Sequence, residues 1–101
     1  MQVAHGIDIP LEELAELCRR YHVRELALFG SVLRDDFREQ SDIDVLVEFD
    51  ADAPVGFIEH FGLQEELSRL LGRDVDLISK RGLKPAIRRS VLDSALVLYA
   101  A

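Results

Sequence analysis

Two aspartates separated by one residue are the side chains most able to do chemistry in this sequence. Asp42 and Asp44 directly precede the apolar run 45–47, which is typical of a buried strand. Residues two apart in a strand point to the same side, with Cα atoms roughly 6.5 Å apart. Carboxylates at that spacing can reach the same hard cation, or two adjacent ones. Two aspartates alone would more commonly be solvated surface charges, so their neighbours decide the interpretation.

A glycine-serine pair supplies the first such neighbour. Gly30 and Ser31 follow the apolar run 26–29, where we expect a strand to turn into a helix. Free backbone N–H groups and a small hydroxyl at such a turn form an anion site. A phosphate cradle beside an acidic metal site predicts a nucleoside triphosphate with magnesium.

A third aspartate, Asp76, lies in another apolar run, 75–78. An isolated carboxylate there would be partly desolvated, and a cation shared with Asp42 and Asp44 would offset that cost. Neighbouring strands lie roughly 4.8 Å apart, so Asp76 can face the pair if its strand is adjacent. We expect Asp74, two residues earlier, to lie in solvent at the strand mouth.

The elements that must position these residues alternate between strand and helix. Apolar periodicity and turn residues predict helices over 10–22, 32–37 and 56–71 and one beginning at Pro85, with strands over 26–29, 42–49, 75–78 and 96–99. In the helix over 56–71, Phe57 and Phe61 are expected on the core side. The fold class is therefore α/β (α+β), a small sheet with helices packed on it, in a single domain over 1–101.

Composition and charge limit the possible partners. The chain is 49% hydrophobic and 31% charged, which is ordinary for a globular protein, and its net charge of −7 argues against direct nucleic-acid binding. Residues 35–66 hold eleven acids and one base, whereas 69–90 hold seven bases and two acids. The basic third could attract a triphosphate or an acidic partner protein, or the charges could simply keep the protein dissolved.

Several features predict a protein of the cytoplasm with no membrane contact. No apolar run is long enough to span a bilayer, and residues 1–10 lack a signal pattern. The lone cysteine, Cys18, excludes an internal disulfide and falls at a helical apolar spacing, so we expect a small buried hydrophobe. The histidines are interpreted as surface or helix-end residues: His5, His22 and His60. Lys80 and Arg81, which follow the run 75–78, are interpreted as solvated loop cations, with a role in guarding the site as the alternative.

The segments 28–31 and 41–47 together resemble the signature of the minimal nucleotidyltransferases of the polymerase-β superfamily. That signature is a glycine-serine pair, ten residues, and then aspartate-any-aspartate in a hydrophobic strand. Asp76 within 75–78 fits the third carboxylate of the family, and the tail 83–99 resembles the family's ending. The resemblance implies a polymerase-β-like fold with a short mixed sheet.

The resemblance also implies roles for the site residues. Asp42 and Asp44 would bind magnesium, as two ions, and Asp76 would complete the site and help to deprotonate an incoming hydroxyl. Gly30 and Ser31 would hold the β- and γ-phosphates of ATP.

Two positions beside the glycine-serine pair leave alternatives open. Arg34 matches a position where the family usually has arginine and could touch the triphosphate, or it could be a surface arginine paired with an acid. Asp35 stands where a glycine is usual in the family, which adds a negative charge near the nucleotide.

By analogy with the family, the implied reaction is transfer of AMP from ATP to a hydroxyl of a partner HEPN-type toxin, a tyrosine by expectation, so that the chain acts as an antitoxin. One alternative is a non-catalytic module that masks its partner sterically. Another is a transferase acting on a small molecule, which the short chain disfavours. A homodimer through a sheet edge or through the helix with Phe57 and Phe61 also stays open.

Overall fold

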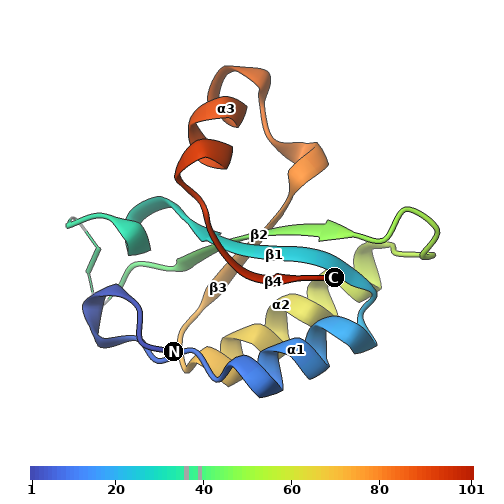
Figure 1. Ribbon diagram of the computed structural model, residues 1–101, viewed down its shortest axis with the longest axis horizontal. Coiled ribbons are helices and arrows are strands. Elements are labelled where there is room, and N and C mark those ends of the chain that lie inside the picture. Colours follow the sequence, from blue (N-terminus) through green and yellow to red (C-terminus); the bar gives the residue numbers. More distant parts are fainter. Residues whose placement is uncertain (36, 39) are drawn as a thin grey trace.

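A four-stranded mixed sheet forms the centre of the fold (Figure 1). The computed structural model describes residues 1–35, 37–38 and 40–101. In chain order the elements are η1 (Ala4–Gly6), α1 (Leu11–Arg20), β1 (Val23–Phe29), η2 (Gly30–Leu33), β2 (Ile43–Phe49), α2 (Phe57–Leu71), β3 (Val75–Ser79), η3 (Lys80–Gly82), α3 (Pro85–Ser94) and β4 (Leu96–Ala100). This architecture confirms the predicted α+β fold class.

The strand order β3-β2-β1-β4 brings the strands that carry the aspartates together. β2 and β3 run parallel, joined by α2 as a crossover helix, and β1 is antiparallel to both β2 and β4. β1 begins at Val23, earlier than predicted, and its register with β2 shifts between Val23 and Glu25. This irregularity and the charged residues within it conceal the start of the strand in the sequence.

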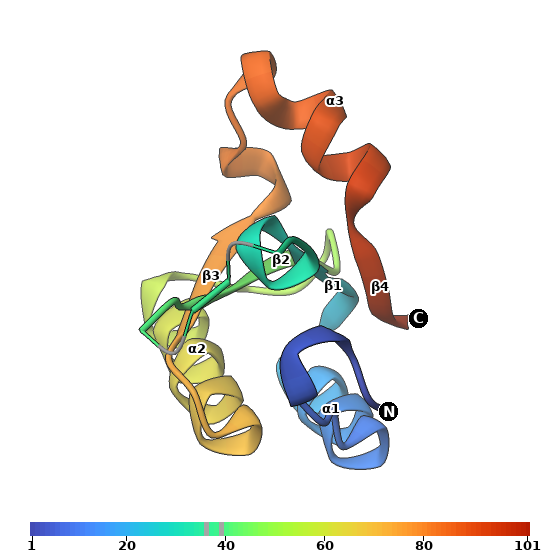
Figure 2. The ribbon, with the colours of Figure 1, turned by 90° about the vertical axis from the view of Figure 1, so that its left-hand side faces the viewer.

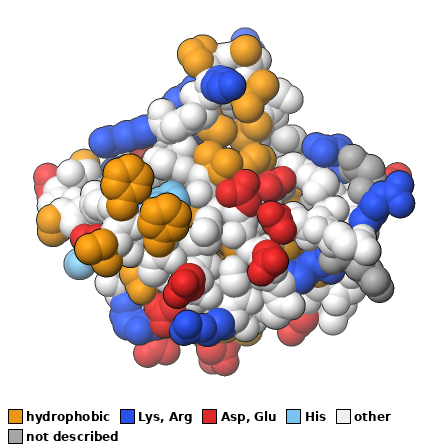
Figure 3. Space-filling view, turned by 180° about the vertical axis from the view of Figure 1, so that it is seen from behind, with side chains coloured by type: hydrophobic (Ala, Val, Ile, Leu, Met, Phe, Trp, Pro, Cys, Tyr) orange, Lys and Arg blue, Asp and Glu red, His pale blue; other side chains and the backbone are white. Residues whose placement is uncertain are grey.

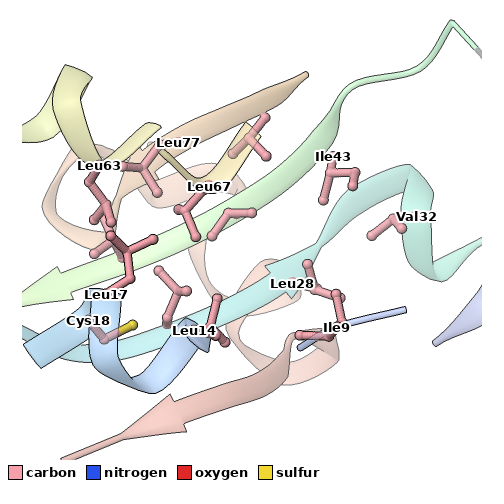
Figure 4. Close-up of a cluster of buried hydrophobic side chains, with 14 of the residues drawn as sticks. Ile9, Leu14, Leu17, Cys18, Leu28, Val32, Ile43, Leu63, Leu67 and Leu77 are labelled. Carbon is pink, nitrogen blue, oxygen red and sulfur yellow. The ribbon is translucent and has the colours of Figure 1, made fainter. Parts of the chain in front are cut away.

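Helices α1 and α2 cover one face of the sheet and enclose the main core (Figures 1 and 2). Figure 4 shows Leu14 and Leu17 of α1 and Leu63 and Leu67 of α2 gathered over the sheet. From β2, the alternating residues Ile43, Val45 and Val47 join them and are at most 1% exposed. The intervening residues Asp44, Leu46 and Glu48 therefore point to the opposite face.

Cys18 is part of this core, as predicted. Burial raises the pKa of its thiol to about 12. The thiolate is therefore negligible at neutral pH, so Cys18 acts as a small apolar side chain and has no nucleophilic role.

Helix α2 also protects the outer edge of β3. Gln64 Oε1 accepts a hydrogen bond from the Leu77 N–H at 2.9 Å, and Ser68 Oγ accepts one from the Val75 N–H at 3.0 Å. The His60 ring is 2.8 Å from the Leu77 carbonyl oxygen through Nε2. His60, Gln64 and Ser68 are spaced by four residues, so one helical face supplies all three partners. His60 is thus half-buried and engaged, which corrects its interpretation as a surface residue.

The first turn of α2 does not lie where its apolar pattern suggested. Phe57 is 82% exposed and Phe61 is 56% exposed, so the prediction that they face the core is wrong. The buried residues of the helix are Leu63 and Leu67, and Leu70 and Leu71 pack half-buried against the core, so only the Phe57–Phe61 side turns away from it. The two rings stack on each other with centroids 6.2 Å apart.

The predicted helix over 32–37 is also wrong. The short 3-10 helix η2 ends at Leu33, and Arg34 has extended backbone angles (φ −121°, ψ 169°). Buried Val32 anchors this turn in the core, and residue 36 lies outside the described part of the chain.

Helix α3 stands off the opposite face of the sheet (Figure 2). It has no buried residue, and beneath it lies a small cluster of Ala27, Leu46 and Leu83. Within the described residues, none of the helices is long and apolar enough to cross a membrane.

Candidate functional site

Three aspartates meet at one end of the sheet, on the face opposite α1 and α2. Asp44 in β2 and Asp76 in β3 are direct register partners across the parallel pair. Asp42 directly precedes β2 and stands two residues before Asp44. The backbone pairing thus places Asp44 beside Asp76, and Asp42 lies just outside the paired strand residues.

The electrostatics of Asp44 reflect this convergence. Burial raises the pKa of the Asp44 carboxyl, and the nearby carboxylates of Asp76 and Asp42 raise it further. The Ser31 backbone N–H, which donates a hydrogen bond to this carboxylate, and the positive charge of Arg34 act in the opposite direction. Asp44 is half-buried, whereas Asp42 and Asp76 are exposed. The expectation that Asp76 is partly desolvated is therefore wrong, and the desolvated carboxylate is that of Asp44.

Gly30 lets the turn approach the carboxylate closely. Its φ of +75° lies in the left-handed region that favours glycine. A Cβ built on Gly30 would overlap Asp44 Oδ2, so any side chain here would have to displace that carboxylate. The turn and the aspartate therefore form one unit, although η2 is too short to provide the helical anion site expected after Gly30.

Arg34 lies at the end of this unit. Its charge lowers the pKa of Asp44, which places the guanidinium within electrostatic range of the carboxylates. The Arg34 carbonyl oxygen is 2.7 Å from His5 Nε2, which ties the η2 segment to the N-terminal part of the chain. Arg34 is exposed, so its cation is accessible to a bound anion.

The donor set fits magnesium, but the structure does not form a closed coordination shell. Within the described residues, no three histidine, cysteine or acidic side chains are placed to hold an ion together. Magnesium prefers oxygen ligands and usually keeps several waters, binding through one or two carboxylates plus substrate phosphates. The negative charges of Asp42 and Asp76 repel that of Asp44, and a bound cation would relieve this repulsion. Asp42, Asp44 and Asp76 are thus suited to a metal that arrives with its substrate.

A groove of about 880 Å³ lies next to the carboxylates along β3. Asp76 lines it together with Phe57, His60 and Phe61 of α2. Figure 3 shows this side of the molecule, where exposed aromatic rings lie beside a histidine and acidic side chains gather near the centre. The sequence pattern does not predict this groove, because it places Phe57 and Phe61 in the core. The spacing of these two phenylalanines by four residues, directly after the Asp50–Pro54 loop, was the signal for an exposed aromatic wall.

Lys80 lines the groove at its η3 end, and it is not a solvated loop cation. Its Nζ is 2.5 Å from Glu25 Oε1 and 3.3 Å from Glu48 Oε1. The hydrogen bond to Glu25 is the main reason that the pKa of Lys80 is raised, with Glu48 adding to it. The sequence could not show this group, since its members come from β1, β2 and η3. Asp74, in contrast, is exposed as predicted.

Comparison with known proteins identifies the family of this chain. The Nucleotidyltransferase domain family matches residues 11–98. The protein adenylyltransferase MntA of Thermococcus cleftensis is 45% identical over 78 residues, which cover 76% of this chain and 76% of that protein.

Solved structures show the same fold. A structure assigned as a minimal nucleotidyltransferase has a TM-score of 0.72 at 40% identity, over 85% of this chain and 86% of that chain. A complex described as a tri-AMPylated Shewanella oneidensis HEPN toxin with MNT antitoxin gives a TM-score of 0.63 at 24% identity, over 90% of this chain and 70% of that chain. With the family match over residues 11–98, these likenesses show that the chain belongs to the nucleotidyltransferase domain family and has the minimal nucleotidyltransferase fold.

Proposed function

We propose that this chain is a magnesium-dependent adenylyltransferase that transfers AMP from ATP to a tyrosine hydroxyl of a HEPN-type toxin and so acts as its antitoxin. The observation that carries the proposal is the register pairing of Asp44 with Asp76 beside the Gly30–Ser31 turn. The name of the Thermococcus relative supports a protein acceptor, and the Shewanella complex supports a HEPN partner. We further propose that residues 1–101 act as one domain, in the cytoplasm.

Each site residue has a role in this proposal. Asp42, Asp44 and Asp76 would hold Mg²⁺, as two ions, and bound magnesium would neutralise charge on the phosphates. Gly30 and Ser31 would hold the β- and γ-phosphates, Ser31 through its hydroxyl, since its backbone N–H donates to the Asp44 carboxylate. Arg34 would pair with the triphosphate oxygens.

The reaction is a substitution at the α-phosphorus of ATP. The acceptor hydroxyl oxygen forms a bond to that phosphorus, the bond to the bridging oxygen of the β-phosphate breaks, and pyrophosphate leaves. Asp76 is proposed to accept the hydroxyl proton. Such transfers depend mostly on positioning and electrostatic stabilisation, which a small domain can supply.

A transfer assay tests the function. The chain is incubated with a purified HEPN-type toxin, Mg²⁺ and ATP labelled in the α-phosphate, and mass spectrometry locates the adduct. We expect AMP on a tyrosine of the toxin with wild type, and at least a hundredfold slower labelling with Asp42→Asn and Asp44→Asn. Neutralisation of the toxin without label, unchanged in both variants, would instead show steric masking.

A further inference from the structure

The order of the strands gives the carboxylates two different sides. β1 ends at Phe29, directly before the Gly30–Ser31 turn, and lies on one side of β2. β3 lies on the other side of β2, and the groove follows its outer edge. The aspartates therefore stand between a phosphate-binding turn and an open groove.

The geometry of an in-line displacement assigns one side to the leaving pyrophosphate and the other to the acceptor. The attacking oxygen and the leaving pyrophosphate are roughly in line, on opposite sides of the α-phosphorus. If the β- and γ-phosphates lie at the Gly30–Ser31 turn, the acceptor must approach from the β3 side. Asp76 alone of the three aspartates lines the groove, so the groove reaches the carboxylate group through Asp76.

The walls of the groove suit an aromatic side chain. Phe57 and Phe61 expose their rings, and the half-buried ring of His60 meets the Phe61 ring edge-on at 6.0 Å between centroids. His60 is held in place by the Leu77 carbonyl at 2.8 Å. A volume of about 880 Å³ exceeds the need of a single ring and leaves room for flanking residues of a peptide.

The charges at the η3 end of the groove favour an acidic flank. Arg81 and Arg88 line the groove, and both are exposed. Among the described residues, the groove lining carries three bases (Lys80, Arg81 and Arg88) and three acids (Glu48, Asp50 and Asp76). Lys80 pairs with Glu25 and Glu48, and Arg88 donates a hydrogen bond to the Lys80 carbonyl oxygen at 3.2 Å, which holds its guanidinium at the η3 end. Arg81 and Arg88 thus place two positive charges at the η3 end of the wall, where they complement an acidic residue next to the acceptor.

We infer that this groove is the acceptor site, which takes a tyrosine flanked by acidic residues, with Phe57 and Phe61 contacting its ring and Arg81 pairing with the flank. The inference rests on the proposed function and adds to it the residues that determine acceptor specificity. It assigns the aromatic face of α2 to the acceptor and not to the nucleotide.

Synthetic peptides test this assignment. Peptides of about a dozen residues carry a central tyrosine flanked by glutamates, the same tyrosine flanked by lysines, or a serine flanked by glutamates. With Mg²⁺ and α-labelled ATP, we expect the acidic tyrosine peptide to be labelled about fivefold faster than the basic one, and the serine peptide least. Arg81→Glu should reverse the order of the two tyrosine peptides, whereas Arg89→Glu, outside the groove and 96% exposed along its side chain, should not.

The aromatic wall has its own matched control. Phe57→Ala combined with Phe61→Ala should raise the KM for the acidic tyrosine peptide about tenfold, since the tyrosine ring would lose both aromatic contacts. Ile58→Ala should leave this KM unchanged, because Ile58 is 86% exposed on the same helix but does not line the groove.

A second readout separates the failure of this inference from failure of the proposed function. The rise in melting temperature on adding Mg²⁺ and ATP is measured for each protein. Wild type that gains stability in this way but labels no peptide, or labels acidic and basic peptides equally, would overturn the acceptor site alone. Loss of the ATP-induced shift in the Phe57/Phe61 variant would overturn it too, by showing that the groove holds the base. If wild type shows no shift, the proposed function itself fails.

Discussion

At the residue scale, the site stores unfavourable electrostatics in Asp44. Burial and the charges of Asp76 and Asp42 raise the pKa of its carboxyl. Because the folded-state pKa is raised, the ionised carboxylate destabilises the fold above that pKa, and the penalty disappears as the pH falls through it. Function and stability are therefore opposed at this residue.

Asp44→Asn should raise the melting temperature in metal-free buffer at neutral pH by up to several degrees, because the neutral amide can still accept the Ser31 hydrogen bond. Mg²⁺ should stabilise wild type and not the variant. Thermal unfolding with and without Mg²⁺ measures both effects. Asp74→Asn, at an exposed position two residues before Asp76, is the control and should change neither. A lower melting temperature for metal-free Asp44→Asn would contradict the electrostatic account.

Gly30→Ala should abolish Mg²⁺-dependent ATP binding, because the new Cβ would overlap the Asp44 carboxylate. The left-handed backbone adds a cost of roughly 1–2 kcal/mol in stability. Gly72→Ala separates the two effects: its φ is +69°, but nothing lies within 4 Å of the added Cβ. Calorimetry should find ATP binding intact in Gly72→Ala. Equal losses in the two variants would show that backbone strain alone is responsible.

At the element scale, α2 serves both the fold and the site. One face packs Leu63 and Leu67 into the core, and the adjacent face satisfies the backbone of β3 through Gln64 and Ser68. This pairing fixes the position of the strand that carries Asp76. The same helix leaves Phe57 and Phe61 exposed at its start.

Replacing Gln64 by Leu should destabilise the protein by about 1–3 kcal/mol, since the Leu77 N–H would lose its acceptor. Urea unfolding measures the change. Glu65→Ala provides the comparison on the same helix, because its pair with Arg69 is exposed at 74% and 76% and surface pairs contribute little. Unfolding free energies that do not differ between the two variants would refute the role of Gln64 at the strand edge.

The Lys80 group links three elements and predicts a second stability effect. Lys80→Ala should cost on the order of 1 kcal/mol, because Glu25 and Glu48 would lose the cation between them. The pKa of Lys80 is raised in the folded state, so this stabilisation is complete below the ordinary lysine pKa and is lost as the pH rises through the folded value. Urea unfolding at neutral and strongly alkaline pH should show the difference between wild type and variant shrinking. Lys84→Ala, at an exposed position, should show no such dependence.

At the scale of the whole molecule, local pattern predicted the fold well. The alternation of Ile43, Val45 and Val47 identified β2 and hence the face on which Asp44 lies. The apolar runs also identified β3 and β4, and the spacing of Cys18 its burial. These features depend on neighbours in the sequence, which periodicity can detect.

The failures concern contacts between distant segments. Which apolar stripe of α2 faces the sheet is decided by β3, so Phe57 and Phe61 were misplaced. The Lys80 group joins Glu25 and Glu48 across the fold, and no local pattern announces it. The pairing of Asp44 with Asp76 was predictable, because two apolar runs identify the strands that place them in register. The groove was not predictable, because it depends on which side of α2 stays exposed.

In the proposed function, Asp42, Asp44 and Asp76 bind ATP together with magnesium beside the Gly30–Ser31 turn. Isothermal titration with a non-hydrolysable ATP analogue, in Mg²⁺ and in EDTA, measures this binding for wild type and for the combined Asp42→Asn and Asp44→Asn variant. We expect wild type to bind the analogue with Mg²⁺ only, and the variant not to bind it. Equal affinity in both proteins, or binding to wild type that is unchanged in EDTA, would refute the magnesium-dependent site.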